Sequence, residues 1–165
     1  MNKTSNIMTR YSKISVANLV RRLRRTKKKI VFTNGVFDII HFGHIDYLQK
    51  AKVLGDILIV GLNTDSSVKK FKSKDRPVQS QNDRAKILTA LEAVDYVIMF
   101  SEETPERLIK MVKPDVLVKG ADYKIHEIVG ADVVKSYGGR VKRIRLAKGR
   151  STTAIIKKIK KMKAI

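Results

Sequence analysis

One segment decides the fold of this 165-residue chain, and from residue 29 to residue 44 it reads KIVFTNGVFDIIHFGH. Its first residues, 29–33, form a short apolar run that predicts a buried strand, and the turn-forming pair Asn34-Gly35 follows. A helical pattern of apolar residues then begins at Gly43. A strand that passes through a turn into a helix is the repeating unit of α/β folds, so this segment predicts such a fold.

The alternation of strands and helices continues along the rest of the chain. Residues 56–61 are almost continuously apolar, which is typical of a parallel strand covered on both faces. Residues 69–79 are polar and basic, and we expect a mobile loop there. The other predicted strands are 96–100, 116–119 and 140–146, and the other predicted helices are 15–25, 81–93, 105–112, 128–137 and 152–163. The pattern predicts a Rossmann-like α/β fold, a doubly wound parallel sheet with helices on both faces and ligands beyond the carboxyl ends of its strands.

The composition excludes several classes of protein. The chain has no Cys, which excludes disulfides, thiolate catalysis and thiolate metal sites. No apolar run approaches the roughly 18 residues that a membrane span needs. Residues 1–10 lack the apolar core of a signal peptide, so we expect a cytoplasmic protein without a membrane partner.

The chain is strongly basic, because 36 Lys and Arg against 15 Asp and Glu give a net charge of +21. A field of this sign attracts polyanions, and nucleic acid is the first partner to consider. The basic residues crowd at 21–29 and 157–163, however, and no aromatic residue lies among them to stack on bases. We therefore favour a general basic bias of the proteome, or solvated helix faces, over nucleic-acid binding. A third interpretation is that the field collects phosphorylated substrates.

Two histidines, His41 and His44, point to a chemistry. Three positions apart at the start of a helix, their side chains face the same way across one turn. A helix N-terminus favours phosphate, and Gly43 lets a phosphate approach the backbone. Structural histidines and a metal pair are the alternatives, but metal pairs are usually four residues apart with a third ligand nearby, and the only other histidine is His126. The motif therefore predicts phosphate chemistry, with the histidines stabilising charge during the reaction.

The pattern Gly35-x-Phe37-Asp38-x-x-His41-x-Gly43-His44 resembles the signature of the cytidylyltransferase-like branch of the nucleotidyltransferase superfamily. Within that branch the resemblance is strongest to the adenylyltransferases of ADP-heptose synthesis, which act on D-glycero-β-D-manno-heptose 1-phosphate. The chain departs from the family pattern at Phe42, Ala121 and Arg150, none of which removes a catalytic group. The stretches that carry the resemblance are 33–38, 51–56, 76–78, 91–95, 103–108, 114–120 and 151–153.

This resemblance implies an activity and its partners. A sugar phosphate would attack the α-phosphate of ATP in line and release pyrophosphate, with Mg²⁺ held by the nucleotide phosphates and by no protein ligand directly. The product would be ADP-heptose for the lipopolysaccharide core. The resemblance also implies a homodimer and a stand-alone form that lacks the sugar kinase domain of many relatives. Residues 1–28 would form a basic N-terminal extension, and residues 29–165 the nucleotidyltransferase domain.

Two alternative functions remain open. A cytidylyltransferase acting on glycerol 3-phosphate, or on a similar alcohol phosphate, would share the His-x-Gly-His and Ser-Thr-Thr strings. Those relatives carry Arg-Thr-Glu-Gly where this chain has LAKG at residues 146–149, which favours the heptose phosphate. The alternative from another class is a basic nucleic-acid-binding module on an inactive version of the fold, and the retained histidines argue against it.

The resemblance also implies which residues form the site. His41, His44 and Lys72 would be catalytic, and Lys72, Asp65 and Arg76 would bind the sugar phosphate. The nucleotide would be bound by Asn34, Gly35, Val36, Phe37, Asp38, Gly43, Arg84, Lys119, Gly120, Asp122, Ser151, Thr152 and Thr153.

Several of these residues also have a purely structural explanation. Asp38 would orient its loop, directly or through metal-bound water, or would simply cap the turn after the strand. Arg84 would contact phosphates or form a surface ion pair. Lys72 is one of several lysines in its loop, and only the resemblance singles it out. Residues 119–123 would bind ligand or form an ordinary turn, and residues 151–153 would cap a helix and bind phosphate at once.

Overall fold

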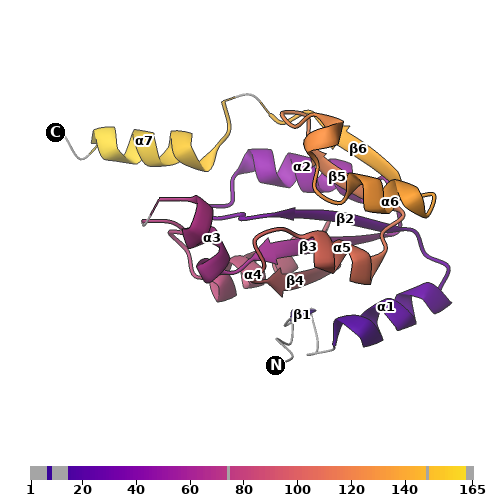
Figure 1. Cartoon of the computed structure of the whole chain (residues 1–165). Coiled ribbons are helices and arrows are strands. Elements are labelled where there is room, and N and C mark those ends of the chain that lie inside the picture. Colours follow the sequence, from indigo (N-terminus) through magenta and orange to yellow (C-terminus); the bar gives the residue numbers. More distant parts are fainter. Residues whose placement is uncertain (1–6, 9–14, 74, 148, 163–165) are drawn as a thin grey trace.

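The fold is a six-stranded sheet with helices on both faces (Figure 1). The computed structural model describes residues 7–8, 15–73, 75–147 and 149–162. The strands are β1 (Ile7–Met8), β2 (Ile30–Gly35), β3 (Ile57–Asn63), β4 (Tyr96–Phe100), β5 (Val116–Gly120) and β6 (Arg140–Ile144). The helices are α1 (Val16–Arg25), α2 (Phe42–Lys52), α3 (Asp65–Phe71), α4 (Gln81–Ala90), α5 (Glu106–Val112), the 3-10 helix η1 (Ile125–Glu127), α6 (Ala131–Ser136) and α7 (Thr152–Met162).

The strands lie in the order β1-β4-β3-β2-β5-β6 across the sheet. Strands β2 to β6 run parallel, and β2 lies between β3 and β5. The chain first adds strands on one side of β2 and then crosses to its other side, so the strand order reverses between β2 and β5. This order confirms the predicted Rossmann-like doubly wound fold. The sequence did not predict β1, a two-residue strand that pairs antiparallel with β4 at the edge.

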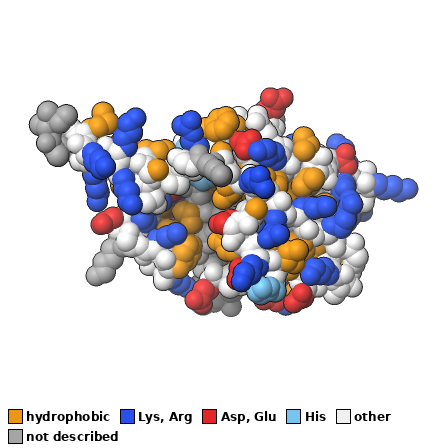
Figure 2. Space-filling model, turned by 90° about the horizontal axis from the view of Figure 1, so that it is seen from above, with side chains coloured by type: hydrophobic (Ala, Val, Ile, Leu, Met, Phe, Trp, Pro, Cys, Tyr) orange, Lys and Arg blue, Asp and Glu red, His pale blue; other side chains and the backbone are white. Residues whose placement is uncertain are grey.

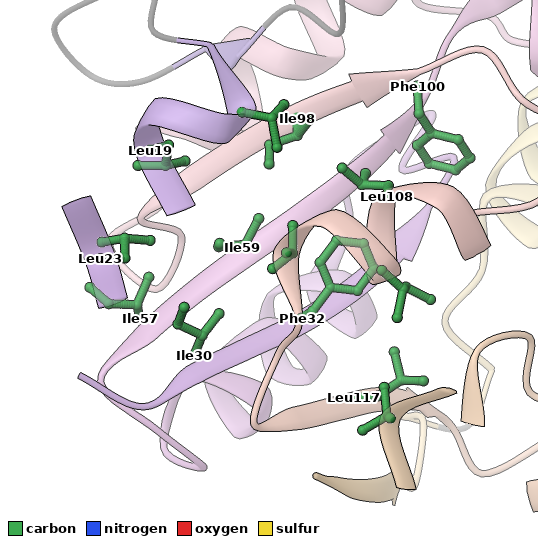
Figure 3. Packing of buried hydrophobic residues seen from close by; sticks show 14 of the residues in the cluster. Leu19, Leu23, Ile30, Phe32, Ile57, Ile59, Ile98, Phe100, Leu108 and Leu117 are labelled. Carbon is green, nitrogen blue, oxygen red and sulfur yellow. The ribbon is translucent and has the colours of Figure 1, made fainter. Parts of the chain in front are cut away.

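Each parallel strand sends alternate side chains into two cores, one on each face of the sheet. In β3, Ile57 and Ile59 point to the face covered by α1, α5 and α6 (Figure 3). Leu58 and Val60 point to the other face, which α2 and α4 cover. Every residue of β3 is buried, and this explains why its sequence is apolar without alternation.

Helix α1 lies in the segment that was expected to form an extension, and it packs on the sheet. The Ser15 hydroxyl accepts a hydrogen bond from the Asn18 N–H at 3.3 Å and caps the helix. Val16, Leu19 and Leu23 are buried in the same core as the strands. Figure 3 shows Leu19 and Leu23 beside the strand residues of this core. The hydrophobic effect therefore holds α1 on the sheet, although most of its other residues are basic.

Several predicted boundaries were wrong. The helix expected at 81–93 ends at Ala90, and the strand expected at 140–146 ends at Ile144. The loop expected at 69–79 begins later, because α3 continues to Phe71; Thr64 caps this helix, and Val68 is fully buried. The helix expected at 128–137 begins only at Ala131, because Gly130 has a φ of 85° and so cannot belong to a right-handed helix.

Helix α7 projects from the body of the molecule (Figure 1), and none of its described residues is buried. Ile159 and Met162 on this helix are exposed. Within the described ranges, no helix is both long enough and apolar enough to cross a membrane.

Leu19→Ala should lower the free energy of unfolding by about 2–5 kcal/mol, because the Leu19 side chain is completely buried between α1 and the sheet. Val53→Ala is the control: Val53 is 81% exposed, and its truncation should change this free energy by less than about 0.5 kcal/mol. Unfolding in guanidinium chloride, followed by circular dichroism, measures both. Equal effects of the two variants would show that α1 does not stabilise the core.

Candidate functional site

A pocket of about 400 Å³ opens at the carboxyl ends of β2 and β5. The strand order reverses between these two strands, which is where a doubly wound sheet is expected to bind its ligand. The loops after β2, α3 and β5 form its walls, together with the N-termini of α2 and α7. The pocket therefore lies close to the point where α7 leaves the body of the molecule (Figure 1).

Most of the predicted site residues line this single pocket. They are Asn34, Gly35, Val36, Phe37, Asp38, His41, Gly43, His44, Lys72, Arg76, Lys119, Gly120, Asp122, Ser151, Thr152 and Thr153. Two predicted residues, Asp65 and Arg84, do not line it. Because the lining residues come from separate segments of the chain, only the fold brings them together.

The two histidines of the motif are stacked at the N-terminus of α2. Their ring centroids are 3.9 Å apart and their planes differ by 21°. Phe37 packs against His44 with a centroid distance of 5.2 Å. The His41 carbonyl accepts the His44 N–H at 2.9 Å, but the His41 side chain does not cap the helix. Its imidazole is therefore available to a ligand.

Both histidines are neutral at neutral pH in the free protein. Burial lowers the pKa of His41. Burial, reinforced by the neighbouring His41, lowers the pKa of His44 to about 4. The buried Nδ1 of His41 has no hydrogen-bond partner within the part of the chain that the structure describes. Phosphate oxygens would supply a partner, and their negative charge would raise both pKa values.

The N-termini of two helices, α2 and α7, open into the pocket. Gly43 lies in the first turn of α2, where a Cβ would come within 3.1 Å of the His41 ring and of the Arg150 Cβ. At α7 the Ser151 hydroxyl accepts the Ala154 N–H at 3.1 Å, so Ser151 is the cap within the 151–153 stretch that was expected to cap this helix. Because helix N-termini favour anions, the pocket can bind phosphate groups from two sides.

Asp38 holds the loop after α3 against the loop after β2. Its carboxylate is almost completely buried and accepts hydrogen bonds from Arg76 Nε at 2.6 Å, from the Val78 N–H at 2.9 Å and from the Gln79 N–H at 3.0 Å. Burial acts to raise the pKa of Asp38, but the two amides and Arg76 together outweigh it and lower this pKa below 3.8. The geometry therefore favours direct orientation of the loop by a charged Asp38.

Arg84 and Asp65 require a correction, because the structure places them outside the pocket. Arg84 is completely buried, and its guanidinium donates to the carbonyls of Gln79 at 3.1 Å and Val36 at 2.5 Å. It also pairs with the Asp65 carboxylate at 2.7 Å. Arg84 is thus neither a phosphate contact nor a surface ion pair. It joins α3, α4 and the loop after β2, and a buried cation needs such partners to be stable.

Lys72 and Lys119 bring two cations to the pocket. Lys72 follows the last residue of α3, and its side chain is exposed on the pocket wall. Lys119, in β5, donates to the Asn34 carbonyl at 3.3 Å, and its ammonium lies 5.3 Å from the centre of the Tyr123 ring. Burial lowers the pKa of Lys119 to about 8, against the opposing effect of Asp122. Lys119 is therefore mostly charged at neutral pH.

Three lining residues were not predicted as site residues: Tyr47, Leu146 and Arg150. Tyr47 lies one turn after His44 on α2, and its hydroxyl is 2.7 Å from the Thr33 hydroxyl. That spacing of three was an available signal. Arg150 directly precedes the predicted 151–153 stretch, which was a weaker signal. No signal in the sequence pointed to Leu146, because only the path of the chain after β6 brings this residue to the pocket.

Across the described ranges, no group of three or more His, Cys, Asp or Glu side chains could hold a metal ion. The oxygens of Asp38, the acidic residue of the motif, are already engaged by Arg76 and two amides. A divalent ion in this pocket would therefore need ligand oxygens, such as those of phosphates, for most of its coordination.

Known proteins resemble this chain over most of its length. Residues 32–158 match the family model described as Cytidylyltransferase-like. The bifunctional protein HldE of Wolinella succinogenes is 55% identical over 148 residues, which is 90% of this chain and 30% of that protein. The HldE of Nitratiruptor sp. is 57% identical over 138 residues, 84% of this chain and 29% of that protein. The chain therefore spans less than a third of the length of either relative.

A solved structure also matches. The lipopolysaccharide core biosynthesis protein from Thermoplasma volcanium GSS1 superposes with a TM-score of 0.59 at 33% sequence identity. The match covers 73% of this chain and 98% of that one.

Asp38→Asn should lower the free energy of unfolding at pH 7 by about 1–3 kcal/mol, because it removes the charge that pairs with Arg76 and accepts two amide hydrogen bonds. The folded-state pKa of Asp38 lies below its ordinary value of 3.8. The stabilisation is therefore complete above pH 3.8 and is lost as the pH falls through the folded-state pKa.

Denaturant unfolding of both proteins, from neutral pH to well below pH 3.8, measures this effect. The difference between wild type and variant should shrink at the acid end. A difference that stays the same at every pH would mean that the charge of Asp38 contributes nothing.

Proposed function

This chain belongs to the cytidylyltransferase-like family, and from that premise we propose that it is an adenylyltransferase that joins the AMP part of ATP to a sugar 1-phosphate and releases pyrophosphate. One observation carries the proposal: the stacked His41 and His44 share a pocket with two helix N-termini and with Lys72. Such a pocket suits two phosphorylated substrates that must approach each other.

The sugar phosphate in this proposal is D-glycero-β-D-manno-heptose 1-phosphate, and the product is ADP-heptose for the lipopolysaccharide core. The identity of more than half of the aligned residues with HldE proteins supports this substrate. The solved lipopolysaccharide core biosynthesis protein supports the same area of metabolism. Residues 146–149 read LAKG and not Arg-Thr-Glu-Gly, which speaks against glycerol 3-phosphate.

The attacking phosphate needs no general base. A sugar 1-phosphate has a second pKa of about 6, so it is already a dianion at neutral pH. The larger obstacle is the repulsion between two polyanions. The positive ends of α2 and α7, together with Lys72 and Lys119, would offset this repulsion and hold the reacting atoms close to each other.

The histidines would act on the nucleotide. As ATP binds, the negative phosphates would raise the pKa of His41 and His44, both of which are low in the free protein because of burial. Each imidazole would then donate a hydrogen bond to a phosphate oxygen. These donors are fixed by stacking before the reaction, so they would stabilise the charge that develops at the α-phosphate without reorganisation. No covalent enzyme intermediate is needed.

Two further residues, Asp38 and Arg84, would position this machinery without touching the substrates' reacting atoms. Asp38 and Arg84 tie the loop after β2, which leads to the histidines, to the loop that follows Lys72.

Mg²⁺ would enter with ATP, held by the nucleotide phosphates, and would neutralise charge on the departing pyrophosphate. The pocket fits this role because Arg76 and two amides already engage the Asp38 carboxylate, so phosphate oxygens would supply most of the ligands of the ion.

A homodimer is part of the same proposal. Helix α7 projects from the body and exposes Ile159 and Met162, which a second copy of the chain could cover (Figure 1).

Pyrophosphate release in the presence of Mg²⁺ tests the proposed activity. ATP and CTP are each combined with heptose 1-phosphate and with glycerol 3-phosphate, and only ATP with heptose 1-phosphate should react.

His44→Ala should reduce kcat by about 10²–10³-fold, the loss typical for removal of a donor to developing charge. His126→Ala is the matched control and should be fully active, because His126 is exposed and lies outside the pocket. Release with CTP and glycerol 3-phosphate alone would overturn the substrates, and no release in any combination would overturn the activity.

Lys72→Ala should reduce kcat/KM for the sugar phosphate by about 10–100-fold, because a charge-assisted hydrogen bond to phosphate is lost. Lys70→Ala removes the same charge from α3 at a position that does not line the pocket, so it should change kcat/KM by less than about twofold. Steady-state kinetics at fixed ionic strength compares the two. Equal losses would mean that the general positive field, and not the position of Lys72, assists the reaction.

A further inference from the structure

A second cavity, of about 550 Å³, lies at the amino ends of the parallel strands, opposite the candidate site at their carboxyl ends. The turns that lead into β2, β5 and β6 form it. It contains six cations, which are Arg24, Lys27, Lys28, Lys29, Lys113 and Arg140. Lys and Arg side chains also crowd the end of the molecule away from α7 in Figure 2. This basic cavity shares no residue with the pocket of the histidines.

The single carboxylate in the basic cavity is engaged by the protein itself. Asp115 Oδ2 accepts the Ile30 N–H at 2.7 Å, and its Oδ1 lies 3.6 Å from the Arg24 guanidinium. Arg24 also donates to the carbonyls of Val112 and Lys113. Asp115 and Arg24 therefore hold the scaffold together. The other five cations have no ion-pair partner within the described ranges, so the cavity has a large uncompensated positive charge.

The walls of the basic cavity are preformed. Two hydrogen bonds join Asp115, in the turn before β5, to Ile30 of β2. The Asp115 carboxylate accepts the Ile30 N–H, and the Asp115 N–H donates to the Ile30 carbonyl at 2.9 Å. The Arg140 N–H donates to the Asp115 carbonyl at 2.9 Å, and the Tyr137 hydroxyl donates to the Pro114 carbonyl at 3.1 Å. Three segments that are distant in sequence are thus locked together around the opening. A ligand would bind without ordering the backbone first.

Two of the lysines occupy strained backbone positions. Lys27, just after α1, has a φ of 54°, and Lys113, just after α5, has a φ of 47°. Glycine or asparagine is usual at such left-handed positions, and another residue costs about 1–2 kcal/mol there. The negative ends of the α1 and α5 dipoles attract cations, and this accounts in part for Lys27 and Lys113. They do not account for Lys28, Lys29 and Arg140, which lie at no helix end.

We propose that the basic cavity is a second anion site, which binds a ligand with closely spaced phosphate groups. Five unpaired cations converge on one preformed opening, and this favours several negative charges over one. Apart from Tyr137 and two glycines, every residue in the lining is charged. The site does not depend on the proposed enzymatic activity, because it lies at the other end of the parallel strands.

Amide chemical shifts of the ¹⁵N-labelled chain, titrated with tripolyphosphate at low ionic strength, test this proposal. Gly138 and Gly139 line the basic cavity and report on it, whereas Gly43 and Gly120 report on the pocket of the histidines. We expect saturable shifts at Gly138 and Gly139. Binding is read directly at each site, so the result stands whether or not the chain proves to be an adenylyltransferase.

Two triple variants with the same loss of charge give the decisive comparison. Lys28→Ala/Lys113→Ala/Arg140→Ala removes cations from the basic cavity, and its affinity at Gly138 should fall by about tenfold or more. Lys157→Ala/Lys158→Ala/Lys160→Ala removes three exposed cations from α7 and should keep its affinity within about twofold. Shifts at Gly43 and Gly120 should persist in the cavity variant, which shows that it is folded.

Vesicles of phosphatidylcholine, with and without phosphatidylglycerol, identify the source of the phosphates. Cosedimentation with anionic vesicles that is lost only in the cavity variant would support the proposal with lipid headgroups as the ligand. Tripolyphosphate shifts that depend on the cavity, without cavity-dependent vesicle binding, would support it with a free oligophosphate. If neither form of binding weakens more in the cavity variant than in the α7 variant, the proposal is overturned.

Discussion

Two buried charges, the carboxylate of Asp38 and the guanidinium of Arg84, hold the loops of the candidate site together. Asp38 accepts hydrogen bonds from the loop after α3, and Arg84 donates to that loop, to the loop after β2 and to α3. Both side chains are almost completely removed from water, so each is stable only while its partners are in place. The loop after β2 leads to His41 and His44, and the other loop begins beside Lys72. The position of His41, His44 and Lys72 relative to one another, which the proposed reaction requires, therefore depends on this pair of charges.

Burial also explains how the pocket responds to its ligands. It lowers the pKa of His41, and it lowers the pKa of His44 to about 4, so the free pocket has less positive charge than its residues could supply. Phosphate groups would raise both pKa values again, because a nearby negative charge favours the protonated form. Positive charge would thus increase when the polyanionic substrates arrive. The helix N-termini of α2 and α7 supply a part of the field that does not titrate.

The two proposed anion sites, at the carboxyl and the amino ends of the parallel strands, would attract anions through different chemistry. At the carboxyl ends of the strands, main-chain dipoles point toward the pocket, and a few cations complete it. At the amino ends, α1 and α5 present their negative ends, and the positive charge comes from side chains alone. The net charge of +21 is consequently not spread evenly, since one part of it gathers in a preformed cavity that contains a single, already paired carboxylate.

Local patterns in the sequence determined most of the elements, the parallel α/β class, and the placement of His41 and His44 on the same side of one helical turn. These features depend on residues that are neighbours in the chain, where periodicity and spacing can be read directly. Only the tertiary structure decided the short α3 and β1, the shared pocket and the role of Arg84. The local sequence around an arginine near the start of a helix is the same whether its side chain binds a phosphate or other groups of the protein. The difference arises because folding removes Arg84 from water and surrounds it with carbonyls and a carboxylate from distant segments, and no local pattern records those partners.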